Sequence, residues 1–352
     1  MERINVSASK KYDIIIGEGI FSRCGEFLRE VCKGSRAAVI CDTTTKELFG
    51  PAVCASLEDA GFESFIYAVK AGEESKNAAN FIDILNFLAE KKFNRADCIV
   101  ALGGGVVGDL SGFVAASYLR GISFIQIPTT LLAAVDSSVG GKTAINLDAG
   151  KNLAGAFCQP SCVICDTEII KNLPPEILSD GIAEVIKYGV IRNEKILDLV
   201  KSGVKENMSE IIGECVKIKA RIVAADEFDT GERQLLNFGH TPAHAIEKKS
   251  NFKISHGHAV AAGMCIMSRA AEKLGLCEAG VAKEIEELCE MFSLPVECAF
   301  MAEELFEIAM SDKKRYAGKI TLVVPKVRGM SELVKIPEEE TINFFRAGLE
   351  RK

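Results

Sequence analysis

The histidines of this chain are gathered in one short stretch. All four fall between positions 240 and 258 of the 352 residues. They are His240, His244, His256 and His258. Imidazole is the commonest metal ligand among side chains, and it titrates near neutral pH. Clustering of every histidine predicts one site, and the alternative is a chance grouping of core or surface histidines. The neighbouring Arg233 and Asn237 favour a site, because both suit an anionic ligand.

A carboxylate and an amine occur upstream, in residues 180–188, whose pattern is helical. Glu184 and Lys187 are three residues apart and therefore share a helical face. An ordinary surface ion pair is one interpretation. The residues on both sides are apolar, Ile182 and Val185 among them, so we expect a partly buried face where an unpaired carboxylate is costly. A metal ion would then supply the partner of Glu184.

Two helix starts are predicted around the histidines. Thr241 and Pro242 resemble an N-cap followed by a first-turn proline, which places His240 at the mouth of a helix and His244 inside its first turns. His256 stands just before a helix expected from position 259. Two imidazoles and one carboxylate leave a fourth position open, which is the catalytic arrangement for zinc. Spacing alone does not decide which histidines bind.

A glycine-rich segment, residues 103–109, follows an apolar run and precedes a helical pattern. It satisfies G-x-G-x-x-G, in which glycines let the backbone approach a pyrophosphate at a helix N-terminus. The usual acidic residue about 20 positions later is missing, since no Asp or Glu occurs between Asp109 and Asp136. Asp42 follows an earlier strand and could hold a ribose hydroxyl. We predict a nucleotide-binding domain of non-standard Rossmann order; the alternative is a turn that serves packing only.

Residues 136–143 imitate a phosphate-binding P-loop. That motif needs glycine where Asp136 stands, so the ATPase interpretation fails. Lys142, Lys151 and Asn152 remain, on what we expect to be loops between strands, and they suit contacts to phosphate or carboxylate. A solvated charged loop is the alternative.

The elements that must position these residues change in character along the chain. Apolar runs predict strands at 12–16, 37–41, 64–68, 98–102, 123–127 and 162–165, with helical patterns at 77–92 and 109–118. After residue 173 come long helical patterns at 176–191, 194–221, 259–274 and 278–292, and one apolar run at 320–324 that could be a short strand. Alternating strands and helices predict an α/β N-terminal nucleotide-binding domain with a parallel sheet, residues 1–172. Residues 173–352 would form a mainly α-helical metal- and substrate-binding domain.

Composition excludes several classes of function. The net charge of −7 argues against non-specific nucleic-acid binding. No apolar run approaches the roughly 20 residues that span a bilayer. The N-terminus lacks the apolar region of a signal peptide, so we expect a cytoplasmic protein with its 13 cysteines reduced. Cys162 and Cys165 lie in a predicted strand and would point to opposite faces, which argues against a metal site there.

Together these segments resemble 3-dehydroquinate synthase, a family of the sugar-phosphate cyclase superfamily. The matching stretches are residues 103–109, 112–121, 126–143, 151–157, 184–188, 233–241, 256–257 and 312–314. The most specific runs from Pro128-Thr-Thr-Leu-Leu-Ala to Gly140-Gly-Lys-Thr. The resemblance covers nearly the whole chain and implies a dehydroquinate synthase-like fold.

The resemblance implies NAD and a divalent metal, zinc in the usual case with cobalt as the alternative. Metal ligands would be Glu184, His240 and His256. Contacts to NAD would come from Asp42, Glu73, Lys76, Gly104, Gly105, Val106, Asp109, Thr129 and Thr130, with Lys142 and Lys151. The substrate phosphate would be surrounded by Arg120, Lys142, Asn152, Lys187, Asn237 and His244, with Arg120 reaching across a homodimer interface. The substrate carboxylate would meet Lys219, Arg233 and one of Lys313 or Lys314. Lys151 and Asp136 would lie close to the reacting ring.

The implied substrate is 3-deoxy-D-arabino-heptulosonate 7-phosphate, in the shikimate pathway of aromatic amino acid biosynthesis. Transient oxidation by NAD, elimination of phosphate, reduction and an intramolecular aldol closure would give 3-dehydroquinate. The family lets the departing phosphate take the proton itself, which would explain why no dedicated general base is evident. The chain departs from the family pattern at Asp229, Ala243 and His258, and the role of His258 stays open.

Three other functions compete with this one. A sister cyclase acting on a substrate without a carboxylate would have an altered cationic pocket, whereas Lys219 and Arg233 favour dehydroquinate synthesis. A metal-dependent polyol dehydrogenase would not need the phosphate set and would consume NAD stoichiometrically. A non-catalytic binding protein on the same fold is disfavoured, because no expected catalytic position is lost.

Overall fold

A computed structural model describes residues 1–311 and 318–350 of the chain. Contacts between residues divide it into two compact units. The first consists of Met1–Leu173 with Met208–Glu227, and the second of Pro174–Asn207 with Phe228–Lys352.

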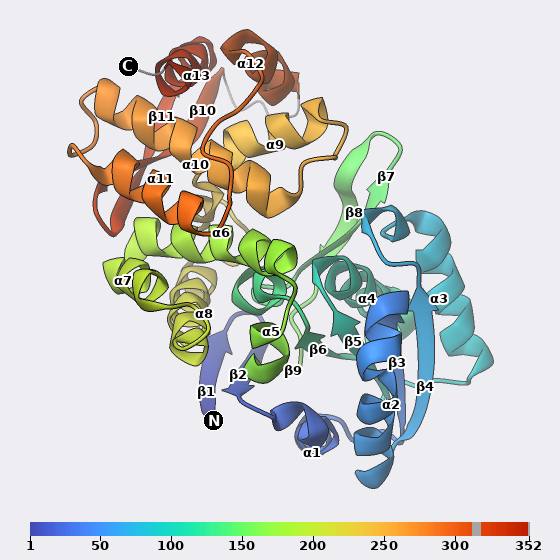
Figure 1. Ribbon diagram of the computed structural model, residues 1–352. Helices are drawn as coiled ribbons and strands as arrows, with labels where there is room; N and C mark the ends of the chain where they lie inside the picture. The colour runs from blue at the N-terminus through green and yellow to red at the C-terminus, as the bar shows by residue number, and fades with distance from the viewer. Residues whose placement is uncertain (312–317, 351–352) are drawn as a thin grey trace. The chain divides into compact units, whose positions relative to one another are not determined.

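The first unit is built on a seven-stranded sheet of order β1-β2-β9-β6-β5-β3-β4 (Figure 1). Its strands are β1 (Glu2–Ser7), β2 (Lys11–Gly17), β3 (Arg36–Asp42), β4 (Glu63–Val69), β5 (Cys98–Gly103), β6 (Ser123–Pro128) and β9 (Cys162–Asp166). β1 is antiparallel to β2, while the other neighbouring pairs are parallel. The predicted parallel α/β sheet and its six expected strands are confirmed; β1 was not expected.

Helices cover both faces of this sheet. α1 (Cys24–Val31) and α2 (Thr43–Asp59) pack on one face, against alternate residues such as Val39 and Cys41 of β3. α3 (Ala78–Glu90) and α4 (Gly105–Ser117) pack on the other, against Ala38 and Ile40. Because both faces are buried, the parallel strands are continuously apolar rather than alternating. The short helix α5 (Thr167–Lys171) follows β9.

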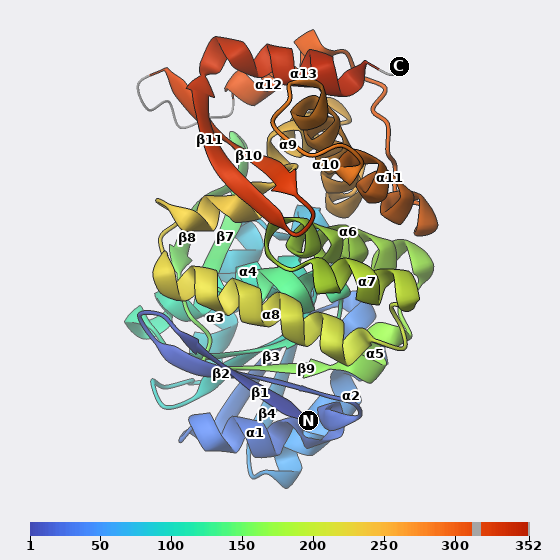
Figure 2. The same cartoon turned by 90° about the vertical axis from the view of Figure 1, so that its left-hand side faces the viewer.

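One predicted helix, 194–221, is wrong. The segment forms two helices, α7 (Glu194–Ser202) and α8 (Met208–Ala225), since Gly203 has φ 125 and ends α7 in a conformation that side-chain-bearing residues rarely adopt. α7 belongs to the second unit, whereas α8 belongs to the first. Figure 2 shows α8 lying against the β1–β2 edge of the sheet, where the two elements are in contact. The compact units therefore differ from a single division near residue 172.

A hairpin projects from the first unit where loops were expected. β7 (Lys142–Leu147) pairs antiparallel with β8 (Gly150–Phe157). Lys142 therefore begins a strand, and Lys151 and Asn152 lie in the next one, so the expectation that these residues are on loops is wrong. The reason is visible in β7, where Thr143 and Ile145 are buried and alternate with more exposed positions.

The second unit is mainly helical, as predicted. Its helices are α6 (Pro175–Arg192), α7, α9 (His240–Lys249), α10 (His256–Lys273), α11 (Val281–Met291), α12 (Ala302–Ser311) and α13 (Thr341–Leu349). α10 contacts α6, α9, α11 and α13 and is buried along most of its length, which makes it the central helix. The expected strand at 320–324 lies within β10 (Lys319–Val327), which pairs with β11 (Met330–Pro337).

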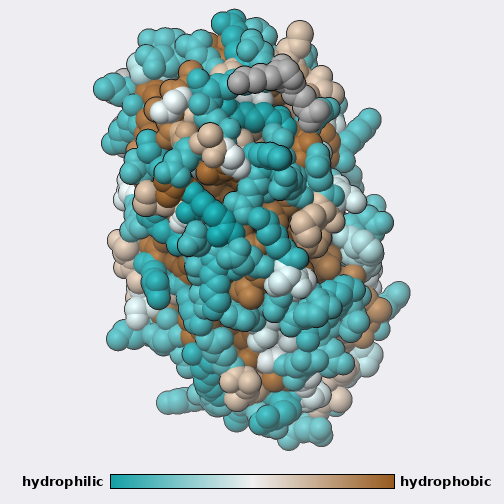
Figure 3. Space-filling view, turned by 60° about the vertical axis from the view of Figure 1, so that its left-hand side comes forward, coloured by the Kyte–Doolittle hydropathy of each residue, from teal (hydrophilic) through white to brown (hydrophobic). Residues whose placement is uncertain are grey.

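Short helical turns complete the chain. They are η1 (Ile20–Arg23), η2 (Glu73–Ser75), η3 (Tyr118–Arg120), η5 (Glu232–Asn237) and η6 (Glu338–Glu340), together with the π-helix η4 (Ala133–Ser137). Among the described residues, no helix is both long and apolar enough to cross a membrane. The face drawn in Figure 3 is mostly hydrophilic, with hydrophobic residues scattered over it in small groups.

Candidate functional site

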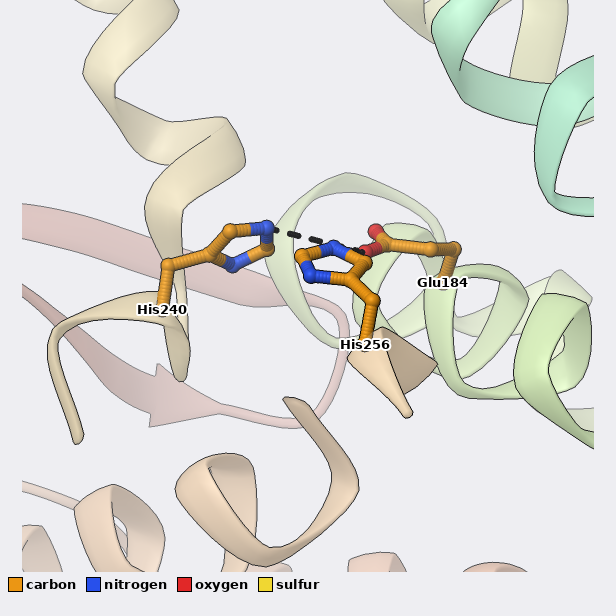
Figure 4. A group of neighbouring side chains, drawn as sticks. All are labelled: Glu184, His240 and His256. Atoms are coloured by element: carbon orange, nitrogen blue, oxygen red, sulfur yellow. Dashed lines mark hydrogen bonds and ion pairs between the residues drawn. The ribbon is translucent and has the colours of Figure 1, made fainter. Parts of the chain in front are cut away.

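Three side chains of the second unit converge on one point. Glu184 lies on α6, His240 is the first residue of α9, and His256 is the first residue of α10. Their ligand atoms all lie within 4.8 Å of one another. Oε1 of Glu184 is 3.2 Å from Nε2 of His256 and 3.6 Å from Nε2 of His240. Figure 4 shows the carboxylate and the two imidazoles pointing toward one another.

Two close backbone approaches bring these elements together. A Cβ on Gly257 would lie 2.2 Å from the carbonyl oxygen of Asp180, one turn before Glu184 on α6. A Cβ on Gly263 would lie 2.1 Å from the carbonyl oxygen of Gly239, which immediately precedes His240. Both distances are far inside van der Waals contact. Only glycine at these positions of α10 allows α6 and the start of α9 to approach closely enough for the ligand atoms to meet.

The helix starts differ from those predicted. Gly239, in the left-handed conformation with φ 76, precedes α9, so His240 is helical and Thr241 is not the N-cap. α10 begins at His256 rather than at 259, and Ser255 is its N-cap residue. A side chain of another helix caps the first turn of α10. The carboxylate of Asp180, on α6, accepts a hydrogen bond from the backbone N–H of His258 at 3.1 Å. Local sequence signals do not reveal a cap supplied from 78 residues away.

Each of the two ligand-type imidazoles has a partner on Nδ1. Nδ1 of His240 is 3.0 Å from the carbonyl oxygen of Phe238, which accepts its hydrogen bond. Nδ1 of His256 is 3.4 Å from Oε2 of Glu247. Donation from Nδ1 leaves Nε2 of both rings for the centre of the cluster, and a partner of this kind commonly sets which nitrogen of a histidine binds metal.

The two imidazoles have opposite pKa shifts. Burial lowers the pKa of His240 to about 3, so this ring is neutral at physiological pH. Burial also acts to lower the pKa of His256, but the carboxylates of Glu184 and Glu247 outweigh it and raise the pKa to about 10. His256 therefore holds a proton between two carboxylates that a cation at the cluster would displace. Two imidazole nitrogens and one carboxylate oxygen are a donor set that fits zinc or a similar divalent metal.

The carboxylate of the cluster is also paired with a lysine. Glu184 and Lys187 are 0% and 1% exposed, and Nζ of Lys187 contacts Oε2 of Glu184. The expectation that this pair lies on a buried face is confirmed. Lys187 places a cation beside the cluster without occupying Oε1, the oxygen that faces both histidines.

In the first unit, the predicted nucleotide contacts lie at the carboxyl edge of the sheet. The strand order changes direction between β3 and β5, and such a switch point is where open α/β sheets bind ligands. Asp42 ends β3, Gly104 and Gly105 follow β5, and Thr129 follows β6. The predicted residues are thus brought to one edge by the topology.

Hydrogen bonds join these loops to one another. Oγ1 of Thr45 donates to the carbonyl of Leu102 at 3.1 Å, and the N–H of Thr129 donates to the carbonyl of Gly103 at 3.0 Å. α4 begins within the glycine-rich loop, after the N-cap residue Gly104, and no side-chain hydrogen bond caps it there. A helix N-terminus with this geometry suits a phosphate.

Asp42, which was predicted to hold a ribose hydroxyl, caps a helix in the structure. Its Oδ1 accepts hydrogen bonds at 2.9 Å from the N–H groups of Thr44 and Thr45, which caps α2. The capping bonds use Oδ1 only, so the geometry is compatible with a ribose hydroxyl at Oδ2. The cap also holds the carboxylate rigidly at the end of β3.

An ion pair between a buried lysine and a half-buried aspartate lies beside the glycine loop. Nζ of Lys76 is 2.5 Å from Oδ2 of Asp109. Burial raises the pKa of Asp109, and Lys76 only partly offsets this. Asn146, which sequence reasoning missed, joins this region to the hairpin. Its Nδ2 donates to Glu73 at 2.7 Å, and its Oδ1 accepts from the N–H of Asn152 at 2.9 Å. No motif pointed to Asn146, because an asparagine in a strand has no local signature.

Lys219 and Asp136 form a second pair of this kind in the first unit. Nζ of Lys219 on α8 donates to the backbone carbonyl of Asp136 at 2.6 Å and to its carboxylate. Lys219 is buried. The resemblance assigned these two residues to different parts of the substrate, whereas the structure brings them into direct contact.

The residues expected around the substrate phosphate are divided between the units. Arg120, Lys142 and Asn152 belong to the first unit, and Lys187, Asn237 and His244 to the second. Arg120 and Asn152 have φ values of 67 and 58, which are uncommon for residues other than glycine and cluster at functional sites.

The remaining predicted residues of the second unit differ in exposure. Arg233 is buried on η5, whereas Asn237 and His244 are exposed. The ring of His244 lies 5.6 Å from that of His240. Nδ1 of His258 is 2.8 Å from Oδ1 of Asp180, so this ring ties α10 to α6 and is not part of the cluster. Lys313 and Lys314 lie outside the described residues.

Comparison with known proteins identifies the family of this chain. The family model for the N-terminal part of 3-dehydroquinate synthase matches residues 66–180, and that for the C-terminal part matches residues 181–315. A 3-dehydroquinate synthase from Enterococcus faecalis is 42% identical over 341 residues, which cover 95% of this chain and 95% of that protein.

Two solved structures share the fold. A 2-deoxy-scyllo-inosose synthase complexed with carbaglucose-6-phosphate, NAD+ and Co2+ has a TM-score of 0.89 at 23% identity, covering 99% of this chain and 100% of that chain. The 2-epi-5-epi-valiolone synthase from Streptomyces hygroscopicus subsp. jinggangensis, with NAD+ and Zn2+ bound, has a TM-score of 0.86 at 21% identity, covering 99% of each chain. Because both family models match and a relative at 42% identity spans nearly the entire sequence, the chain belongs to the 3-dehydroquinate synthase family.

Proposed function

We propose that this protein is a 3-dehydroquinate synthase of the shikimate pathway. It converts 3-deoxy-D-arabino-heptulosonate 7-phosphate to 3-dehydroquinate and phosphate and uses NAD without net consumption. The observation that carries the proposal is the convergence of Glu184, His240 and His256, in a chain whose relatives of that name align over nearly its full length.

Glu184, His240 and His256 are proposed to hold a divalent metal, for which zinc is the favoured ion. Bound there, the ion would polarise the substrate hydroxyl that is oxidised. The choice of zinc rests on the mixed nitrogen and oxygen donors. Of the two solved structures that share the fold, one holds Co2+ and the other Zn2+.

NAD is proposed to bind at the carboxyl edge of the first unit's sheet. The pyrophosphate would lie on the glycine loop at Gly104 and Gly105, and the ribose near Asp42. The remaining contacts would be Glu73, Lys76, Val106, Asp109, Thr129 and Thr130, with Lys142 and Lys151. NAD supplies the hydride acceptor and donor, so the side chains need only position it.

Cations and polar groups are proposed to hold the two ends of the substrate. Arg120, Lys142, Asn152, Lys187, Asn237 and His244 would contact the phosphate. Lys219 and Arg233 would contact the carboxylate, with one of Lys313 or Lys314. Lys151 and Asp136 would lie near the ring. A dense set of fixed charges suits this reaction, because the protein's part is orientation and stabilisation of charge.

The direct test supplies the heptulosonate phosphate with NAD well below the substrate concentration. We expect more than one phosphate released per NAD, with no accumulation of NADH. Removal of metal with a chelator should stop the reaction, and added Zn2+ should restore it. Glu184→Gln should abolish turnover, because the neutral amide lacks the charge of the carboxylate. Glu304→Gln, which removes a surface partner of Lys249, is the matched control and should retain activity.

Two alternative functions give different results in the same assay. A polyol dehydrogenase would accumulate NADH in proportion to the polyol supplied and would release no phosphate. A sister cyclase would release phosphate only from a sugar phosphate that lacks the carboxylate. Either result would exclude dehydroquinate synthesis.

A homodimer in the cytoplasm completes the proposal. The compartment is supported by the 13 cysteines, which are free in the structure and mostly buried, as expected of reduced thiols. The dimer is supported by the turn at Leu119 and Arg120, where Leu119 is 41% exposed with φ 51. Sedimentation should give twice the mass of one chain. Leu119→Asp should lower the measured mass toward that of one chain, because the substitution places a charge in the proposed interface.

A further inference from the structure

We propose that Glu247 is a positioning residue that holds His256 with its Nδ1 protonated and its Nε2 directed at the metal. Nothing in the sequence motifs assigns this glutamate a role. The inference rests on the proposed function insofar as Glu184, His240 and His256 bind a metal. It adds a fourth side chain, which does not touch the ion and acts through His256.

The geometry places Glu247 behind His256. Its Oε2 is 3.4 Å from Nδ1 of His256, while Nε2 of the same ring is 3.2 Å from Oε1 of Glu184. The imidazole is thus held between two carboxylates, one at the centre of the cluster and one on its far side. Only Nε2 can reach both Glu184 and an ion bound beside it, since Nδ1 is directed toward Glu247.

The burial of Glu247 argues for a defined task. Only 7% of the residue is exposed, although it lies in a segment that ends in two lysines, Lys248 and Lys249. A charged glutamate is seldom buried unless it is paired, because burial without a partner is costly. On α9, Glu247 lies two turns after His240 and so shares its face. One helix therefore supplies a cluster residue directly and orients a second.

The two histidines of the cluster are supported differently. The partner of His240 is a backbone carbonyl, that of Phe238, which no substitution removes. The partner of His256 is a side chain, and the His256 side chain is 35% exposed, against 11% for His240, so packing orients this ring less and its partner matters more. A carboxylate on the outer nitrogen fixes the tautomer and orientation of a ligating histidine and raises its basicity. Loss of such a partner typically weakens metal binding by roughly 10- to 100-fold.

The test measures metal binding in the full chain rather than turnover. Dissociation constants for Zn2+, from competition with a chromophoric chelator, would be compared for wild type, Glu247→Gln and Glu247→Ala. Glu304→Gln is the matched control. Glu304 lies on α12 and pairs with Lys249, which is on α9 like Glu247. We expect a loss of roughly 10- to 100-fold in both Glu247 variants and none in the control. Melting curves of the metal-free proteins show whether the variants are folded.

Because the chain has only four histidines, ring ¹⁵N spectra report the tautomer directly. In the Zn2+-loaded wild type, His256 should carry its proton on Nδ1, and this signal should shift or broaden in Glu247→Gln. A wild-type spectrum with the His256 proton on Nε2 would overturn the inference without any variant. Zn2+ affinity in folded Glu247→Gln within about twofold of wild type would also overturn it. Failure of wild type to bind Zn2+ at all would instead contradict the metal role in the proposed function.

Discussion

Substitution of Gly257 by alanine tests how the cluster is assembled. The added Cβ would lie 2.2 Å from the carbonyl oxygen of Asp180, where ordinary contact needs more than 3 Å, so α10 must move away from α6 by about 1 Å. The displaced turn carries His256, and the facing turn precedes Glu184. Metal-ligand distances tolerate only about 0.2 Å. The shift is therefore several times larger than the site can absorb.

Two opposing terms set the effect on stability. Alanine is favoured over glycine in a helix by about 1 kcal/mol, whereas overpacking costs typically about 1–3 kcal/mol. We expect a net destabilisation of about 0–2 kcal/mol, so the variant should still fold. The effect on the site is larger, because a misplacement of about 1 Å can cost on the order of 100-fold. Zn2+ affinity and kcat should fall by about that factor.

The assay combines chelator competition, phosphate release and thermal unfolding of the metal-free protein. Gly213→Ala is the matched control, since Gly213 lies inside α8 and its added Cβ would meet only the carboxylate end of the flexible Glu2 side chain, at 2.8 Å. The reasoning is refuted if Gly257→Ala binds Zn2+ and turns over like wild type. It is also refuted if stability falls while Zn2+ affinity is unchanged, because the glycine would then serve packing alone.

Four further outcomes are expected. Binding of Zn2+ should release about one proton per ion at neutral pH, because His256 is protonated there, with its pKa raised to about 10, whereas His240 is already neutral, with its pKa lowered to about 3. Calorimetry in buffers of different ionisation enthalpy measures the number of protons released. A number near zero would contradict the assignment of His256 as a ligand. The free energy of unfolding of the metal-free protein should depend on pH, because the pKa of His256 is raised on folding. The stabilisation by protonated His256 should be complete below the ordinary histidine pKa of about 6.5 and be lost as the pH rises through about 10. Urea unfolding at several pH values would measure this loss. Lys219→Met should destabilise the fold by about 1–3 kcal/mol, since it removes the buried ammonium that pairs with the half-buried carboxylate of Asp136, and a denaturant midpoint equal to that of wild type would contradict this. Asn146→Ala should raise the KM for NAD and leave Zn2+ affinity unchanged, because it removes the hydrogen bonds that join Asn146 to Glu73 and to Asn152. Equal NAD saturation curves for the variant and wild type would show that these hydrogen bonds do not support NAD binding.

The sequence by itself determined most strands of the sheet and the chemistry of the donors. Six of the strands, β2 to β6 and β9, follow from apolar runs, which depend on neighbouring residues. The grouping of every histidine within 240–258 indicated a metal or anion site, and the apolar neighbours of Glu184 indicated burial. Both features are properties of short contiguous segments. For that reason the sheet and the burial of the Glu184–Lys187 pair could be predicted.

Tertiary structure alone decided which of these residues meet. Glu184 and His256 are 72 residues apart, and their approach depends on Gly257 and Gly263, whose role is to have no side chain. The helical pattern of the sequence continues through Gly203, but α7 ends there, and α8 belongs to the other unit. Glu247 and Asn146 have no local signature, because their partners come from other elements. The periodicity of apolar residues indicates which side of a helix or strand is buried. Which residue of another element packs against that side is decided by contacts between segments that are distant in the sequence.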